Sequence, residues 1–280
     1  MLFSHVAGMI EIITLIQRRK GGICQHMIKK FDVTITPLKK ERTIHLYLPQ
    51  GYEESEERYP VLYMYDGHNL YRDEDATYGK SWGFEEFLDQ YDKPFIMVGI
   101  ECDHEGENRL SEYCPYRLPQ SHFGKLDGYG DVFMEWVVSE LKPMIDRQYR
   151  TIPFRECTMI GGASMGGLMA LYSVIRFNQY FSKAACLSSS IGICMEELKG
   201  EIDKNEMDPD TRVYLSWGSR EMRGKAGMEA AYRSHSELAA RMHRYDVRTF
   251  LNPIAGGRHC EADWEKQIPE FMDYLWKQGD

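Results

Sequence analysis

The sequence of 280 residues has no long apolar run. No stretch reaches the roughly 18 consecutive apolar residues that a membrane-spanning helix requires. Cysteines are few, seven in all, and they are scattered without C-x-x-C or another metal-ligand spacing. An odd, scattered set is typical of reduced thiols and not of a disulfide framework, so we expect a cytoplasmic protein with no metal site. Internal repeats and low-complexity segments are also lacking.

Positive charge is in deficit. The 34 Lys and Arg residues face 43 Asp and Glu residues, which gives a net charge of −9 and an isoelectric point near 5.6. Binding to a polyanion requires a clustered positive surface, and the basic runs here are short. We therefore expect no nucleic acid as a partner, and the lack of a spanning run predicts no membrane partner either. With 43% hydrophobic residues, the chain is ample for one soluble domain with a large core.

The first 26 residues differ from a secretory signal peptide in the order of their parts. Their positive charges, at residues 18–20, follow the apolar stretch instead of preceding it, and Glu11 interrupts that stretch. We therefore predict that residues 1–26 are a peripheral extension that is possibly not part of the fold. Residues 27–280 are then expected to form a single catalytic domain.

Apolar, β-branched runs and helical patterns alternate along most of the chain, which is typical of an α/β fold with a mostly parallel sheet. One helix is expected over residues 130–148, where apolar residues recur at helical spacing and Pro143 disturbs the pattern. The runs predict eight strands, near residues 31–36, 42–48, 61–65, 95–100, 157–161, 183–187, 212–217 and 246–251.

The most informative motif is G-A-S-M-G at residues 162–166, directly after the apolar run 157–160. G-x-S-x-G places a serine on a sharp turn between a strand and a helix, where Gly162 and Gly166 leave room for the adjoining backbone. The Ser164 hydroxyl then stands clear of the sheet, and the backbone N–H of Met165 points to the place where an oxyanion would develop. An ordinary tight turn is the alternative, but a helical pattern follows the serine and favours a nucleophile.

A serine nucleophile needs a base and an acid that orients the base. In α/β-hydrolases the chain order is serine, acid, histidine, which leaves His235, His243 and His259 as candidate bases. The first two lie in or at the end of a polar helical stretch, and we expect them on the surface. His259 lies in the glycine-rich loop G-G-R-H-C, and we interpret it as the general base. A histidine that caps or packs on the last helix is the alternative.

Glu221 is the candidate acid. It follows the predicted strand 212–217 and lies between the serine and His259 in the chain, where a carboxylate would fix the imidazole tautomer. Asp203, Asp208 and Asp210 are rivals, although they precede that strand. The alternative for Glu221 is an exposed glutamate in a charged loop.

A second oxyanion donor is expected in the loop after the predicted strand 61–65, where D-G-H-N occupies residues 66–69. Gly67 lets the backbone turn, so that the N–H of His68 faces the same oxygen as the N–H of Met165. An ordinary D-G turn would have the same sequence.

Five segments give the sequence a family resemblance: L-Y-M-Y-D-G-H-N-L at 62–70, N-R-L-S-E-Y-C-P-Y-R at 108–117, I-G-G-A-S-M-G-G at 160–167, W-G-S-R-E at 217–221 and G-G-R-H-C-E-A-D-W at 256–264. From about residue 29 onward, the chain resembles the esterase D and enterochelin esterase-like group of α/β-hydrolases, which is related to feruloyl esterases and mycolyltransferases. The resemblance implies an α/β-hydrolase fold with a central, mostly parallel eight-stranded sheet flanked by helices. It also implies Ser164 as nucleophile, Glu221 as acid, His259 as base, and the amides of His68 and Met165 as oxyanion hole. Many members have aspartate as the acid, so the glutamate is a departure from the common pattern.

The expected reaction is hydrolysis of a small-molecule ester through an acyl-enzyme, with no metal and no organic cofactor. The acyl group is expected to be small or medium, including carbohydrate or aromatic acyl esters, and loops 71–82 and 103–125 are expected to set specificity. An acyltransferase with the same acyl-enzyme and a catalytically silent binding protein are the alternatives. Peptidase or thioesterase chemistry would use the same residues. The sequence does not distinguish a monomer from a homo-oligomer.

Overall fold

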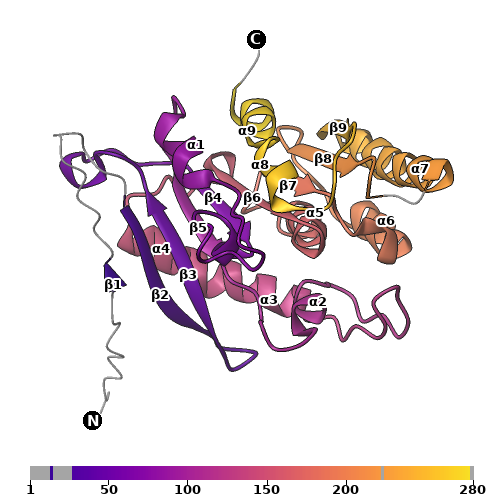
Figure 1. Ribbon diagram of the computed structural model, residues 1–280, viewed down its shortest axis with the longest axis horizontal. Coiled ribbons are helices and arrows are strands. Elements are labelled where there is room, and N and C mark those ends of the chain that lie inside the picture. The colour runs from indigo at the N-terminus through magenta and orange to yellow at the C-terminus, as the bar shows by residue number, and fades with distance from the viewer. Residues whose placement is uncertain (1–12, 15–26, 222–223, 278–280) are drawn as a thin grey trace.

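The computed structural model describes residues 13–14, 27–221 and 224–277. In this part of the chain, nine strands form one sheet in the order β1-β2-β3-β5-β4-β6-β7-β8-β9 (Figure 1). The first strands pair antiparallel up to the β3–β5 contact, and every later pair is parallel. The strands are β1 (Ile13–Thr14), β2 (Met27–Ile35), β3 (Lys40–Leu48), β4 (Val61–Tyr65), β5 (Ile96–Ile100), β6 (Thr158–Ala163), β7 (Lys183–Leu187), β8 (Arg212–Gly218) and β9 (Arg248–Ile254).

Helices cover both faces of the sheet. None of the described helices combines the length and apolarity that would let it cross a membrane. The α-helices are α1 (Phe84–Gln90), α2 (Asn108–Glu112), α3 (Gly130–Trp136), α4 (Lys142–Gln148), α5 (Met165–Arg176), α6 (Met195–Lys204), α7 (Gly224–Met242), α8 (Glu261–Glu265) and α9 (Ile268–Trp276). Short 3₁₀ turns are η1 (Tyr52–Glu54), η2 (Gly67–Asn69), η4 (Arg155–Cys157), η5 (Ile191–Ile193) and η6 (His243–Tyr245).

The eight predicted strands are confirmed as β2 to β9, and the mostly parallel sheet between helices is as expected. The largest boundary difference is at β2, which begins at Met27 and not near residue 31. The sequence misses its first half because Lys29 and Lys30 hide the alternation of apolar and polar residues there. The ninth strand, β1, is a two-residue edge strand that pairs with Lys29 and Lys30. The predicted extension over residues 1–26 otherwise lies outside the described residues.

The core is divided between the two faces of the sheet. On β4, Val61, Tyr63 and Tyr65 belong to one buried cluster, while Leu62 and Met64 belong to the other. Successive side chains of a strand point to opposite faces, so a wholly apolar strand must be covered on both. Helices α3 to α7 supply the first cluster, whereas α1, α8 and α9 supply the second; Figure 1 shows α1 and α9 on one side of the sheet and α3, α4 and α5 on the other.

The helix predicted over residues 130–148 is present but interrupted. A π-helical turn, η3 (Val137–Leu141), lies between α3 and α4, and Pro143 falls in the first turn of α4. A proline ring collides with the carbonyl four residues earlier, here that of Ser139 within the π-turn. The disturbance therefore appears one turn before the proline and not at it.

His235 contradicts the expectation that it lies on the surface, whereas His243 is exposed as expected. The His235 side chain is only 3% exposed and stacks on Trp217, with ring centroids 4.3 Å apart. Its Nδ1–H donates to the carbonyl of Ala231 at 2.8 Å, and its Nε2 is buried with no hydrogen-bond partner among the described residues. The polar neighbours of His235 in the sequence belong to the other side of α7, and for this reason the polar character of the stretch wrongly predicts a surface position for His235.

We expect this histidine to make the protein sensitive to acid. Burial lowers the pKa of His235 from its usual value to about 4. The unfolded chain, with a pKa near 6.5, therefore binds this proton more readily, so stability is full above pH 6.5 and falls as the pH decreases toward 4. Between pH 7 and pH 4.5 the loss from this group should be about 2 kcal/mol. Urea unfolding of the wild type and His235→Gln measures it, and equal pH slopes for the two proteins would contradict the prediction.

Candidate active site

Ser164 lies on the turn between β6 and α5. Its backbone has φ 58° and ψ −120°, which is a rare conformation for a residue with a side chain. The turn is held by main-chain bonds: Ser164 N–H donates to Leu187 at 2.9 Å, and its carbonyl accepts from Leu168 and Ser190, each at 3.0 Å. The strained geometry is that of a tight elbow between a strand and a helix, which presents the side chain at the end of the sheet.

The glycines of the motif are required by close backbone approaches. A Cβ on Gly162 would lie 2.8 Å from the carbonyl carbon of Gly166, and one on Gly166 would lie 3.0 Å from Cβ of Tyr65. The turn can be this tight because Gly162 has no Cβ to collide with the backbone of Gly166. The second places the end of β4 directly beside the first turn of α5.

Glu221 and His259 are brought together by the loops that follow β8 and β9. Oε2 of Glu221 lies 2.9 Å from Nδ1 of His259. The other carboxylate oxygen, Oε1, accepts from the Ser188 hydroxyl and from the Gly218 N–H, each at 2.7 Å. The Ser188 oxygen in turn accepts from the indole N–H of Trp264 at 2.8 Å. Because an ionised carboxylate only accepts hydrogen bonds, Nδ1–H of His259 donates to Glu221, and Nε2 is the nitrogen whose lone pair stays available.

The rival acids are engaged elsewhere. Asp203 forms ion pairs with Arg241 and Arg244. Asp208 and Asp210 both pair with Arg155. Among the four candidate acids, Glu221 is the one that the structure places beside His259.

The proposed oxyanion donors both lie at the carboxyl end of the sheet. Met165 is the first residue of α5, so its N–H has no acceptor within the helix. His68 precedes Asn69, which makes the first bond of η2, to Asp66, at 2.9 Å. A Cβ on Gly166 would lie 3.4 Å from Oδ2 of Asp66, so η2 begins next to the elbow.

An ion pair between Asp66 and Arg109 braces this loop, and sequence reasoning missed it. The guanidinium donates from Nε and Nη2 to the two carboxylate oxygens, both at 2.7 Å, and lies over the ring of Tyr113. Burial raises the pKa of the Asp66 carboxyl, but Arg109 outweighs burial and holds that pKa below its usual value. The two residues are far apart in the chain. The one signal in the sequence is that each lies in a segment of the family resemblance, Asp66 in 62–70 and Arg109 in 108–117.

Ser164 and His259 are not hydrogen-bonded to each other in the described part of the chain. The Ser164 hydroxyl instead lies 3.5 Å from that of Ser190. The two halves of the site are nevertheless adjacent, because Ser164 bonds the backbone of Leu187 and the next residue, Ser188, bonds Glu221. The carboxyl ends of the parallel strands β6 to β9 thus gather all three predicted residues at one edge.

Comparison with known proteins adds a family and a fold. The model of a family described as "Putative esterase" matches residues 35–275. The chain is 26% identical over 191 residues to uncharacterized protein YbbA of Bacillus subtilis (strain 168), which covers 67% of this chain and 72% of YbbA. It is 27% identical over 200 residues to an endo-1,4-β-xylanase/feruloyl esterase of Xylanibacter ruminicola, over 68% of this chain and 24% of that protein.

Solved structures share the architecture. An IroE-like serine hydrolase from Shewanella oneidensis superimposes with a TM-score of 0.71 at 20% sequence identity, over 91% of this chain and 82% of that chain. The sheet order and the helices on both faces are therefore those of the α/β-hydrolase fold, as the sequence predicts.

Proposed function

The chain belongs to the Esterase family, and from that membership we propose that it is a serine carboxylesterase which forms an acyl-enzyme on Ser164. The observation that carries the proposal is the bond between His259 and a nearly buried Glu221, at the sheet edge where the strained Ser164 lies. All three residues fall within the matched range 35–275. We further propose that residues 27–280 form the catalytic domain.

The proposed reaction assigns one role to each residue. Ser164 Oγ attacks the ester carbonyl carbon and gives its proton to Nε2 of His259, while Glu221 stabilises the imidazolium. The N–H groups of Met165 and His68 bind the oxyanion of the tetrahedral intermediate. As that intermediate collapses, His259 protonates the leaving alcohol, and water then releases the acyl group by the same steps.

One local movement is part of the proposal. The hydroxyl of Ser164 must turn from Ser190 toward His259, because proton transfer requires a direct hydrogen bond. The His259 side chain is 44% exposed. Its loop begins with Gly256, which has a positive φ of 74°. A glycine loop of this kind can bring the imidazole closer when substrate excludes water.

The proposed substrate is a small-molecule ester with a small or medium acyl group, including a carbohydrate or aromatic acyl ester. The name of the feruloyl esterase relative supports the aromatic acyl class. Within loops 71–82 and 103–125, Trp82 and Tyr113 are buried and hold the loops in place, whereas Tyr78 is 82% exposed. The six described cysteines are unpaired, which supports the proposed cytoplasmic location.

Hydrolysis of p-nitrophenyl acetate, butyrate, octanoate and ferulate by the purified protein tests the proposal. We expect release of both p-nitrophenol and free acid, with the acetate and butyrate esters turned over faster than the octanoate ester. Adding a sugar or thiol acceptor should not divert the acyl group. Transfer that outpaces hydrolysis would instead identify an acyltransferase, and no turnover of any ester would favour a binding role.

A further inference from the structure

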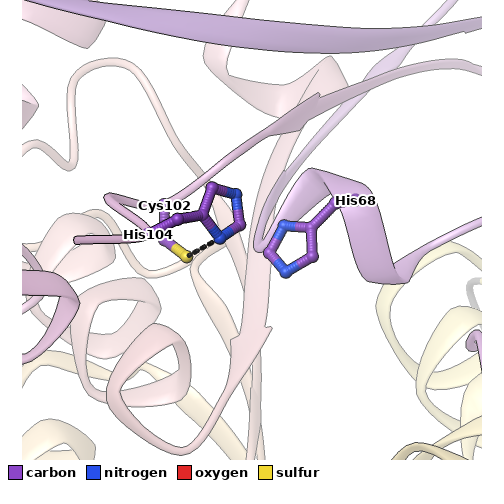
Figure 2. Close-up of side chains that lie close together, drawn as sticks. All are labelled: His68, Cys102 and His104. Atoms are coloured by element: carbon purple, nitrogen blue, oxygen red, sulfur yellow. Dashed lines mark hydrogen bonds between the residues drawn. The ribbon is translucent and has the colours of Figure 1, made fainter. Parts of the chain in front are cut away.

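Two histidines and one cysteine meet at the end of the sheet where η2 lies. His68 belongs to η2, which follows β4, and Cys102 and His104 lie in the loop that follows β5 (Figure 2). Because β4 and β5 are parallel neighbours, both loops leave from the same edge of the sheet. A Cβ on Gly67 would lie 2.5 Å from the carbonyl carbon of Gly99, so the two segments are in direct contact.

The spacing of the three side chains suits a small cation. One ring nitrogen of each histidine and the Cys102 sulfur all lie within 4.8 Å of one another. Nδ1 of His104 is 4.0 Å from Sγ of Cys102, and Figure 2 shows that nitrogen turned to the sulfur, with the His68 ring beside it. Tetrahedral zinc, with bonds near 2.1 Å to nitrogen and 2.3 Å to sulfur, separates its ligands by about 3.3–3.7 Å. Closure by roughly 1 Å would therefore complete the geometry.

The remote nitrogen of each histidine is already held. Nε2 of His104 lies 3.2 Å from Glu101, whose other oxygen lies 2.6 Å from His45. Nε2 of His68 lies 3.0 Å from the hydroxyl of Thr77. Histidines that bind metals usually make such a contact through the second nitrogen, often to a carboxylate, because it orients the ring.

Nδ1 of His68 has no hydrogen-bond partner among the described residues. His68 is only 6% exposed, and this nitrogen is buried. A buried polar atom of this kind is costly unless something occupies its lone pair or accepts its proton. With Nε2 engaged by Thr77, Nδ1 is the nitrogen that an ion would bind.

We propose that His68, Cys102 and His104 form a binding site for a divalent transition metal of the zinc type. Two imidazoles and a thiolate match the preference of this ion. On binding, the sulfur–hydrogen bond breaks, the proton passes to water and a metal–sulfur bond forms, with no change of oxidation state. The His104 side chain is 54% exposed, which gives the ion an entry path and leaves room for water as a fourth ligand.

His68, Cys102 and His104 have no recognised metal-ligand spacing, which is why the sequence by itself predicts no metal site. The pairing of β4 with β5 assembles them. If the His68 amide is an oxyanion donor, which rests on the proposed function, the ion would fix η2 through the side chain of the same residue. Metal binding is measured here without turnover, so its failure is distinct from failure of the esterase proposal.

The test is titration of the metal-free full chain with Co²⁺, followed by competition with Zn²⁺. We expect one equivalent of Co²⁺ to bind with thiolate-to-cobalt charge-transfer absorption, and Zn²⁺ to displace it. Cys102→Ser should abolish that absorption and, like His104→Ala, weaken binding by at least about 100-fold. Glu101→Gln, which removes the positioning contact to His104, should weaken binding by roughly 10–100-fold.

Two matched variants serve as controls. Cys157→Ser replaces a cysteine directly before β6, at the end of the sheet opposite the proposed site. His243→Ala replaces an exposed histidine on η6, and both variants should bind Co²⁺ like the wild type. Wild-type affinity in Cys102→Ser, or a wild-type complex without sulfur charge transfer, would overturn the proposal. If circular dichroism shows that Cys102→Ser does not fold, His104→Ala decides, because its half-exposed side chain can be removed without opening the core.

Discussion

Ser164→Ala is expected to lower kcat for p-nitrophenyl butyrate by about 10⁴–10⁶-fold, with the protein still folded and still able to bind the ester. Alanine removes the oxygen that we propose forms the acyl bond. The amides of Met165 and His68 remain, and in comparable enzymes such groups alone sustain only a small residual rate. Steady-state kinetics measure the loss, and circular dichroism confirms the fold.

The structure gives a reason to expect little damage to stability. The Ser164 side chain does not cap α5, and among the described residues its hydroxyl contacts that of Ser190 at 3.5 Å. Alanine at the same strained backbone should therefore change the free energy of unfolding by no more than about 1 kcal/mol. A large loss of stability would mean that the hydroxyl has a structural role.

Ser190→Ala is the matched control, because its hydroxyl is the neighbouring candidate for the same chemistry. We expect it to lose less than about tenfold in kcat, as it removes a ground-state contact and no reacting atom. An organophosphate ester should label the wild type and Ser190→Ala once each, and leave Ser164→Ala unlabelled. If labelling and turnover instead follow Ser190, the nucleophile has been misassigned.

The parts of the site that could be predicted are those that local sterics determine. Gly162 and Gly166 stand where a Cβ would strike backbone or a β4 side chain, so the motif itself reports the turn. The strands could be predicted because apolar and β-branched side chains run along most of their length, and the sequence predicts too short a β2 because Lys29 and Lys30 break that run. The helix after the serine could be predicted for the same reason, since every residue from 165 to 175 is buried.

The parts that could not be predicted depend on which distant segments meet. Ser188 and Trp264 complete the surroundings of Glu221. Ser188 belongs to no motif, and the segment 256–264 that ends at Trp264 does not reveal that its indole meets Ser188, because only the fold brings α8 beside the end of β7. The sequence predicts His235 on the surface because the residues of α7 that pack on Trp217 are few and lie in a mostly polar stretch. The cluster at His68 likewise exists only once β4 lies beside β5.

Glu221→Gln should lower kcat by about 10⁴-fold, the second largest effect we expect. The carboxamide can keep the contacts to Ser188 and Gly218 only by accepting through its oxygen, which turns its NH₂ group toward His259. That NH₂ group is a donor, so Nδ1 of the imidazole must accept and the proton must move to Nε2. An imidazole in this tautomer cannot take the proton of Ser164. The loss should therefore appear in kcat, with KM nearly unchanged.

Glu221→Asp separates charge from position. The shorter side chain keeps a carboxylate that fixes the tautomer, but it must reach about 1.5 Å further to the imidazole. We expect it to retain at least about tenfold more activity than Glu221→Gln, because a misplaced charge still favours the imidazolium. Similar losses in the two variants would mean that the distance to His259 matters and the charge does not. Near-normal turnover in Glu221→Gln would move the acid to another residue and leave the Glu221–His259 bond as a structural contact of the loop.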